Sequence, residues 1–218
     1  MNFIGTEKLL WFDKLFLSLK AAITSGVTQD EIIIFFDIKL TSQDYTVKDL
    51  YPAISNKLKK TSLTNRENII NSFKKSYSLY EYDVPEQFKM LSWQQVKEMK
   101  QSGLVDFAIH TATHRMLTEI PDNELEQEII KPKQQLEEIL QDQVYSFTYP
   151  NGIPERDFTK FHEEYLRKAG FLCAFSTEEI LNHPNRNVFR LGRKPAGNDI
   201  TSNLNFFRLN TSGFTELF

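Results

Sequence analysis

Short apolar segments alternate with amphipathic segments between residues 91 and 191, and this alternation constrains the fold more than any other feature of the sequence. The strand-like segments lie at 104–109, 144–149, 171–176 and 188–191. The segments with helical spacing of apolar residues lie at 93–101, 122–140 and 158–168, and Pro132 is expected to bend the longest of them. Strands that alternate with helices through short connectors are typical of a parallel sheet or an α/β barrel.

The first 90 residues are predicted to be mainly helical. Apolar residues at three- and four-residue spacing indicate a helix over 9–23, and two more helices are expected at 47–59 and 64–75. Thr64 and Glu67 fit a capping box at the start of the last one. The β-branched and aromatic run at 32–36 instead predicts two short extended pieces within 31–45. We expect one domain over 1–218, with N-terminal helices and an insertion at 1–90, a barrel core at 91–191 and a C-terminal tail at 192–218.

Composition excludes several classes of protein. The 18 Phe, 8 Tyr and 2 Trp need a core, and a single Cys cannot form an internal disulfide. No apolar run is long enough for a membrane span, and charged residues interrupt 3–19, so no secretory signal is predicted there. The sequence as written is typical of a cytoplasmic chain, but the localisation stays open because the N-terminus is expected to be incomplete. The net charge of −3 favours no class of partner, and the basic stretch at 45–80 lacks the Gly-rich or aromatic pattern typical of single-stranded nucleic-acid binding, so no nucleic-acid binding is predicted.

His110 and His114 are the sharpest chemical signal in the sequence. Four-residue spacing on a helical turn would place both imidazoles on one face, about 5–6 Å apart at Cβ. At that separation they can share a divalent cation, and they directly follow a predicted strand, at the end where barrels gather their ligands. A zinc-protease motif is disfavoured, because Thr111 stands where its glutamate base would be. The alternative is two histidines that merely begin a helix.

The sequence Tyr149-Pro150-Asn151-Gly152 closes another predicted strand with a sharp turn. Such a turn is expected to leave the N–H and the ring of Tyr149 available at a groove. The alternative is an ordinary turn without a functional role.

Taken in order, several segments resemble the polysaccharide deacetylase family, the metal-dependent carbohydrate deacetylases that include chitin-oligosaccharide and peptidoglycan deacetylases. The matching text is LSWQQVKEM at 91–99, SG at 102–103, HTATH at 110–114, Leu117, LEQEI at 125–129, FTYPNG at 147–152 and AGF at 169–171. A weaker resemblance covers FIG at 3–5 and LWFDKL at 10–15.

The resemblance implies an incomplete, distorted (β/α) barrel that binds a divalent metal ion, zinc first and cobalt or nickel as alternatives. His110 and His114 match the two imidazole ligands, and the N–H of Tyr149 matches the donor that would stabilise the oxyanion. Thr111, Pro150 and Asn151 are expected to line the substrate groove. The implied substrate is an N-acetylated carbohydrate, hydrolysed by metal-activated water.

Some motifs of the family have no counterpart in this sequence. Its Asp-Asp pair, which supplies a base and a metal ligand, would precede Phe3, so the chain is expected to be truncated at its N-terminus. Asp37 imitates the pair but lacks the second Asp and the Gly. No late Leu-x-His motif is present, since His183 lies in a loop and His162 is expected at the surface.

Two functions within this family therefore stay open, and a third alternative, an unrelated helical interaction protein, holds only if 104–109 and 144–149 are not neighbouring parallel strands. One is a deacetylase whose activity is impaired without the Asp-Asp motif. The other is a non-catalytic remnant that binds glycan or a protein. A barrel without its first strands would have an open edge, at which a second copy or a partner is expected to bind.

Overall fold

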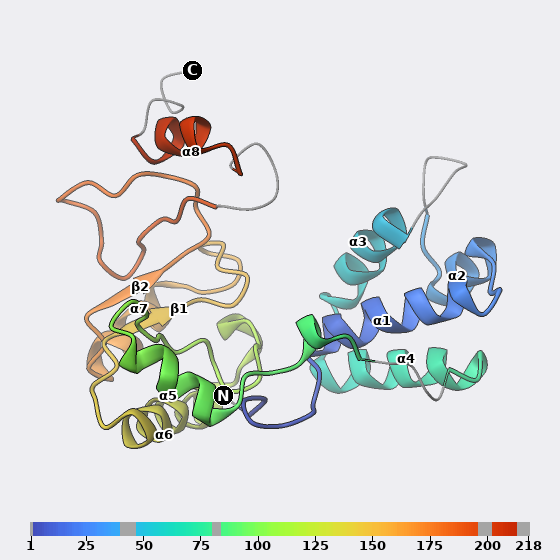
Figure 1. The fold of residues 1–218 in the computed structure, drawn as a ribbon, viewed down its shortest axis with the longest axis horizontal. Coiled ribbons are helices and arrows are strands. Elements are labelled where there is room, and N and C mark those ends of the chain that lie inside the picture. The colour runs from blue at the N-terminus through green and yellow to red at the C-terminus, as the bar shows by residue number, and fades with distance from the viewer. Residues whose placement is uncertain (1, 40–46, 80–83, 196–201, 213–218) are drawn as a thin grey trace. The chain divides into compact units, whose positions relative to one another are not determined.

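The computed structural model describes residues 2–39, 47–79, 84–195 and 202–212, and Figure 1 shows the ribbon. The chain divides into two compact units, Phe3–Ser92 and Trp93–Phe218 together with Met1–Asn2. The division falls two residues from the predicted boundary between the N-terminal part and the barrel core. That the whole chain forms one domain stays a prediction. In the described ranges, no helix is long and apolar enough to cross a membrane.

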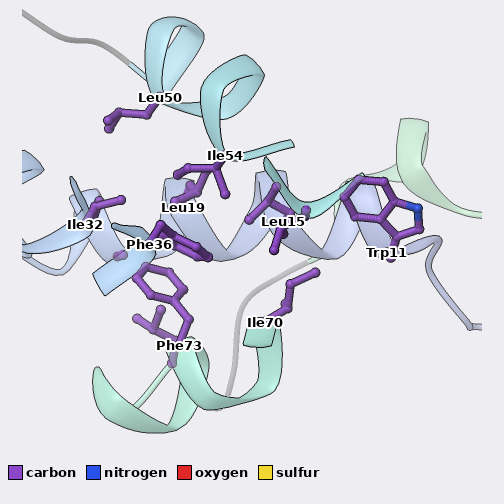
Figure 2. Close-up of a cluster of buried hydrophobic side chains, with 12 residues drawn as sticks. Trp11, Leu15, Leu19, Ile32, Phe36, Leu50, Ile54, Ile70 and Phe73 are labelled. Carbon is purple, nitrogen blue, oxygen red and sulfur yellow. The ribbon is translucent and has the colours of Figure 1, made fainter. Parts of the chain in front are cut away.

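The unit Phe3–Ser92 is built from helices. They are α1 (Trp11–Thr24), α2 (Gln29–Phe36), α3 (Val47–Leu58), α4 (Leu63–Ser76) and the short 3-10 helix η1 (Glu86–Phe88). The helices predicted at 9–23, 47–59 and 64–75 are confirmed within two residues at each end. Their apolar stripes meet in one core, whose buried side chains include Leu15, Leu19, Ile54 and Phe73 (Figure 2).

The extended pieces predicted around 32–36 are wrong, because this run forms α2. Thr28 caps the helix: its hydroxyl accepts the N–H of Glu31, whose carboxylate in turn accepts the N–H of Thr28 at 2.8 Å. Ile32 and Phe36, one helical turn apart, are both buried in the core. Capping and burial therefore override the β-propensity of the run. The rest of the predicted stretch, at 40–45, lies outside the described residues.

The capping box predicted for Thr64 and Glu67 is also wrong. Ser62 is the N-cap of α4, and its side chain accepts the N–H of Asn65. Glu67 instead pairs with Lys14 of α1, at 2.8 Å between Nζ and Oε2. The N-cap lies two residues earlier than expected because Ser62, and not Thr64, supplies the side-chain acceptor.

Replacing Phe73 with alanine tests this helical core. Its ring is fully buried and touches Phe35, Phe36 and Tyr77. We expect Phe73→Ala to lower the free energy of unfolding of this unit by about 3–5 kcal/mol, because a large cavity replaces the ring. Ile34→Ala, at a residue 76% exposed, is the control and should change it by less than about 0.5 kcal/mol. Denaturant unfolding followed by circular dichroism measures both, and equal losses would contradict this assignment of the core.

The second unit contains the sheet. Strands β1 (Ser146–Thr148) and β2 (Cys173–Phe175) pair in parallel, with Phe147 opposite Ala174. Single parallel bridges add Ile109 beside Phe147 and Leu191 beside Phe175. The four predicted strands therefore lie side by side in chain order. This parallel arrangement is part of a (β/α) barrel, which is incomplete and distorted as predicted. The first strand is much shorter than expected, since only Ile109 of 104–109 forms a bridge.

Helices precede the first of these strands and connect the next two pairs. They are α5 (Trp93–Gln101), the 3-10 helices η2 (Leu117–Glu119) and η3 (Asp122–Glu124), the π-helical turn η4 (Glu126–Ile130), α6 (Lys131–Leu140) and α7 (Lys160–Lys168). A last helix, α8 (Leu204–Thr211), lies in the predicted C-terminal tail. In Figure 1, α5, α6 and α7 lie around the two strands.

The helix predicted over 122–140 is divided into three parts. Pro132 lies in the first turn of α6, directly after a π-helical turn whose backbone is also helical, and a proline at that position needs no N–H donor. The bend expected at Pro132 stays a prediction. The π-helical turn η4 precedes it and carries Glu128 and Ile129 into the interior, since both are buried. The π-helical turn therefore places a carboxylate in the interior of the protein.

His162 is buried, so its predicted place at the surface is wrong. It lies in the first turn of α7 and is only 6% exposed. Its Nδ1 accepts the N–H of Thr159 at 3.0 Å and so completes a cap for the helix. Burial lowers the pKa of His162, and the nearby Asp122 and a hydrogen bond with the backbone of Leu117 only partly oppose this shift.

This burial predicts a loss of stability in acid. Below about pH 6.5, the unfolded chain takes up a proton on His162 that the folded chain does not. The free energy of unfolding should therefore fall as the pH drops through about 6.5 and level off below the folded-state pKa. In His162→Gln, whose amide can still cap α7, the fall should be smaller, and denaturation midpoints at a series of pH values measure it. An equal or steeper fall in the variant would contradict the role of His162.

Candidate metal centre and oxyanion turn

Groups that could bind a metal ion or a substrate lie where the parallel strands end. His110 follows the bridge residue Ile109, the turn 149–152 follows β1, and Thr177 lies two residues beyond β2. Thr177 joins the last two, because its N–H donates to the carbonyl of Gly152 at 2.9 Å and its hydroxyl to that of Asn151 at 2.7 Å. Because parallel strands share one carboxyl end, these groups occupy the same edge of the sheet.

The two imidazoles converge beside this turn, as the sequence predicted. The ring centroids of His110 and His114 are 4.7 Å apart, and the rings meet edge to face at 84°. Nδ1 of His110 lies 2.7 Å from the carbonyl oxygen of Thr148, the residue just before Tyr149. A carbonyl only accepts, so Nδ1 carries the proton and Nε2 keeps its lone pair. This is the arrangement by which a ligating histidine is usually oriented.

The surroundings of His110 favour its neutral form. Burial lowers the pKa of His110, the hydrogen bond to Thr148 partly opposes this, and the positive charge of Arg193 lowers it further. Arg193 is held at the same edge of the sheet, since its Nε donates to the carbonyl of Ser176 at 2.8 Å. A neutral imidazole is the form that binds a metal ion.

The segment between the histidines is a loop, not the helical turn that the four-residue spacing suggested. Thr111 and His114 have φ of +59° and +61°, in the left-handed region. The N–H groups of Ala112 and Thr113 donate to the carboxylate of Glu128 instead of entering a helical ladder. The rings therefore approach each other through backbone reversals, a route that spacing alone does not predict.

The structure corrects the predicted role of Tyr149. Its N–H donates to the carbonyl of Phe175 at 3.1 Å, as a continuation of the β1–β2 pairing, and is not available to an oxyanion. Its ring is fully buried, stacks on Phe158 at 3.5 Å between centroids, and donates its hydroxyl to the carbonyl of Phe189. Burial raises the pKa of Tyr149, so the phenol stays protonated and serves as a structural donor.

Two of the three predicted groove residues are corrected as well. Thr111 and Pro150 are buried, so neither presents its side chain to a substrate. Asn151 is half-buried and has φ of +58°, and its N–H makes no hydrogen bond to any residue of the described ranges. Gly152 permits this turn, since a Cβ there would lie 3.0 Å from both Thr177 N and Tyr149 O. Asn151 is thus the residue of the turn with a backbone donor left over.

The residues present fit a metal ion in part. The two imidazoles supply the borderline nitrogen ligands that zinc, cobalt and nickel accept. Among the described residues, no third His, Cys, Asp or Glu joins them. Asp37, compared with the Asp-Asp motif in the sequence analysis, is the C-cap residue of α2 and forms an ion pair with Lys57 at 2.7 Å. His183 is exposed in a loop, as predicted.

Sequence reasoning missed Glu128, Thr148 and Arg193. The signal for Glu128 was present, because it lies three residues after Leu125 and so falls on the apolar stripe of its segment. A carboxylate at such a position needs partners inside the protein. Nothing in the sequence indicated Thr148 or Arg193, because both depend on which strands are neighbours.

The structure combines a parallel sheet segment with paired histidines at its carboxyl edge. The comparison of the chain with protein families shows which family it belongs to. The family model for polysaccharide deacetylase matches residues 25–173, more than half of the chain. The chain belongs to the polysaccharide deacetylase family. His110, His114, Glu128 and the turn after β1 all lie within the matched residues. No curated protein matches the chain.

Solved structures of deacetylases are similar to this chain. The deacetylase PplD of Streptococcus pyogenes, in complex with acetate, is 19% identical, with 89% of this chain and 85% of that chain covered and a TM-score of 0.49. IcaB from Ammonifex degensii is 21% identical, with 92% and 89% covered and a TM-score of 0.47. A polysaccharide deacetylase from Bacillus cereus is 21% identical, with 59% of this chain and 43% of that chain covered and a TM-score of 0.39. The chain spans 43% of that Bacillus cereus protein and 32% of a similar chain from Bacillus anthracis.

The structural role assigned to the Tyr149 side chain can be tested directly. Tyr149→Phe removes the hydroxyl and leaves the buried carbonyl of Phe189 without this donor. We expect the free energy of unfolding to fall by about 1–2 kcal/mol, with zinc affinity unchanged. Tyr145→Phe, at a residue 52% exposed, is the control and should leave stability unchanged. Thermal unfolding measures the first effect and calorimetric titration the second, and wild-type stability in Tyr149→Phe would refute this role.

Proposed function

We propose that this chain removes N-acetyl groups from a carbohydrate by metal-assisted hydrolysis, with His110 and His114 as two of the metal ligands. The observation that supports this proposal most is the distance of 4.7 Å between the ring centroids of the two histidines, beside the turn after β1. Zinc is the proposed ion, with cobalt and nickel as alternatives, because all three accept imidazole nitrogen. Family membership supports the reaction class, since an N-acetylated carbohydrate is the substrate of polysaccharide deacetylases.

The chain's own residues would divide the work as follows. Thr148 fixes the ring of His110 through its carbonyl and leaves Nε2 with its lone pair. The N–H of Asn151, in place of that of Tyr149, is the backbone donor that we assign to the developing oxyanion. A bound divalent ion would polarise the amide carbonyl and lower the pKa of a coordinated water.

Among the described residues, no group of three or more His, Cys, Asp or Glu could hold a metal ion, so we assign no third ligand. This observation favours the second candidate function, a member of the family that retains the fold and binds glycan or a protein without hydrolysis. Association of two copies through the edge of the sheet stays a prediction. Both functions share the histidine site, so metal binding is tested first and catalysis second.

Zinc titration of single-histidine variants tests the site. We expect His110→Ala and His114→Ala each to weaken zinc binding by at least about tenfold. Loss of a residue that only hydrogen-bonds to a metal ligand already lowers metal affinity by about that factor, and these variants lose a ligand itself. His183→Ala is the matched control, as an exposed loop histidine, and should bind zinc like the wild type. Isothermal titration calorimetry on the full chain measures the affinities. Wild-type affinity in either of the first two variants would refute the ligand assignment.

Acetate release from an N-acetylglucosamine oligosaccharide then separates the two functions. The deacetylase proposal expects zinc-dependent release that is lost in both histidine variants. Zinc binding without any release of acetate would favour the non-catalytic function.

A further inference from the structure

We propose that Glu128 is a positioning residue, whose buried carboxylate holds the loop that brings His110 and His114 together. The proposal rests on the proposed function only where metal binding is the readout. Glu128 matches no predicted site residue, and its side chain lies in the π-helical turn η4, outside the loop that it contacts.

The carboxylate is engaged at both oxygens. Oε2 accepts the N–H groups of Ala112 and Thr113, each at 3.0 Å, and Oε1 accepts the hydroxyl of Thr113 at 2.7 Å. Glu128 is only 5% exposed, so these bonds form away from bulk water. Hydrogen bonds to an ionised acceptor are stronger than neutral ones, and breaking them inside the protein is costly. This side chain holds the middle of the 110–114 loop together with two backbone bonds, from the N–H of Ala112 to the carbonyl of Glu128 at 3.0 Å and from the N–H of Asn2 to the carbonyl of Ala112 at 3.2 Å. Glu128→Ala keeps both backbone bonds, so it removes the carboxylate contacts alone.

The loop needs such an anchor because its backbone is strained. Thr111 is β-branched and buried, yet it adopts φ of +59°, and His114 adopts +61°. Residues of this kind in the left-handed region persist only where their surroundings hold them. The two strained residues flank Ala112 and Thr113, the residues that Glu128 binds. Without the carboxylate, we expect the loop to relax and the two rings to separate.

Arg115 secures the end of the same loop. It directly follows His114, and its Nη1 lies 2.7 Å from Oε2 of Glu124 and 3.8 Å from Oε1 of Glu128. Its Nη2 donates to the carbonyl of Glu119 at 2.8 Å. The positive charge next to Glu128 partly compensates the buried negative charge.

A direct role of Glu128 as the missing third ligand is not supported. Both of its oxygens already accept bonds from the loop, and it does not group with the two histidines as a metal-binding set. Its influence on the site would therefore pass through the loop backbone, which is why we assign it to positioning.

The test compares the wild type with Glu128→Ala in the full chain. In the metal-free protein, NMR measures through-space contacts between the ring protons of His110 and His114. In a second experiment, calorimetry measures zinc affinity. We expect the ring contact to be lost in the variant and zinc binding to weaken by about tenfold or more.

Glu163→Ala is the matched control. Glu163 is also 5% exposed and is also fixed by hydrogen bonds, but to Arg190 and Asn187. It should lose stability as Glu128→Ala does, while its ring contact and zinc affinity stay at wild-type values. A general loss of stability would affect both variants alike, whereas a positioning role affects only the first.

Wild-type ring contacts in folded Glu128→Ala would overturn the proposal. If that variant does not fold, Glu128→Gln replaces it, because the amide keeps one acceptor oxygen where the carboxylate uses two. A weaker ring contact in folded Glu128→Gln would support the proposal, and an unchanged contact would refute it. If the wild type binds no zinc, the proposed function fails, but the ring contact in metal-free protein still decides the role of Glu128.

Discussion

Parallel pairing of short strands is the constraint on which the site depends. Ile109, β1, β2 and Leu191 lie side by side in chain order, so the residues that follow them share one edge of the sheet. The hydrogen bond between His110 and the carbonyl of Thr148 exists only because the segment that ends at Ile109 is the neighbour of β1. A different strand order would separate the histidines from the turn after β1.

Two buried glutamates show how the barrel unit uses charge inside its core. Glu128 binds the loop between the histidines, and Glu163 binds Arg190 and Asn187 of the segment that follows β2. Each carboxylate is almost fully removed from solvent, and each is satisfied by donors from another part of the chain. Irregular loops at the strand ends thereby gain fixed conformations that apolar packing alone does not specify.

Much of the site was predictable from residue types, and the predictions that were wrong failed for physical reasons. His110 and His114 were recognised by spacing and by their place after a strand, although a strained loop, not a helix, brings them together. The resemblance to the family assigned the oxyanion donor to the N–H of Tyr149. The pairing continues one residue beyond β1, however, and passes that role to Asn151 in our proposal. In the N-terminal unit, capping by Thr28 made a helix of a run with strong β-propensity.

The sequence by itself determined the alternation of helices and strands, the apolar stripes of the N-terminal helices and the identity of the paired histidines. These features depend on local periodicity and residue chemistry, which the order of amino acids records directly. Only the tertiary structure decided which N–H groups are occupied, which carboxylates are buried and how the loop at 110–114 bends. Those properties depend on partners distant in the chain: Thr148 lies 38 residues from His110, and Glu128 lies 15 residues from Thr113.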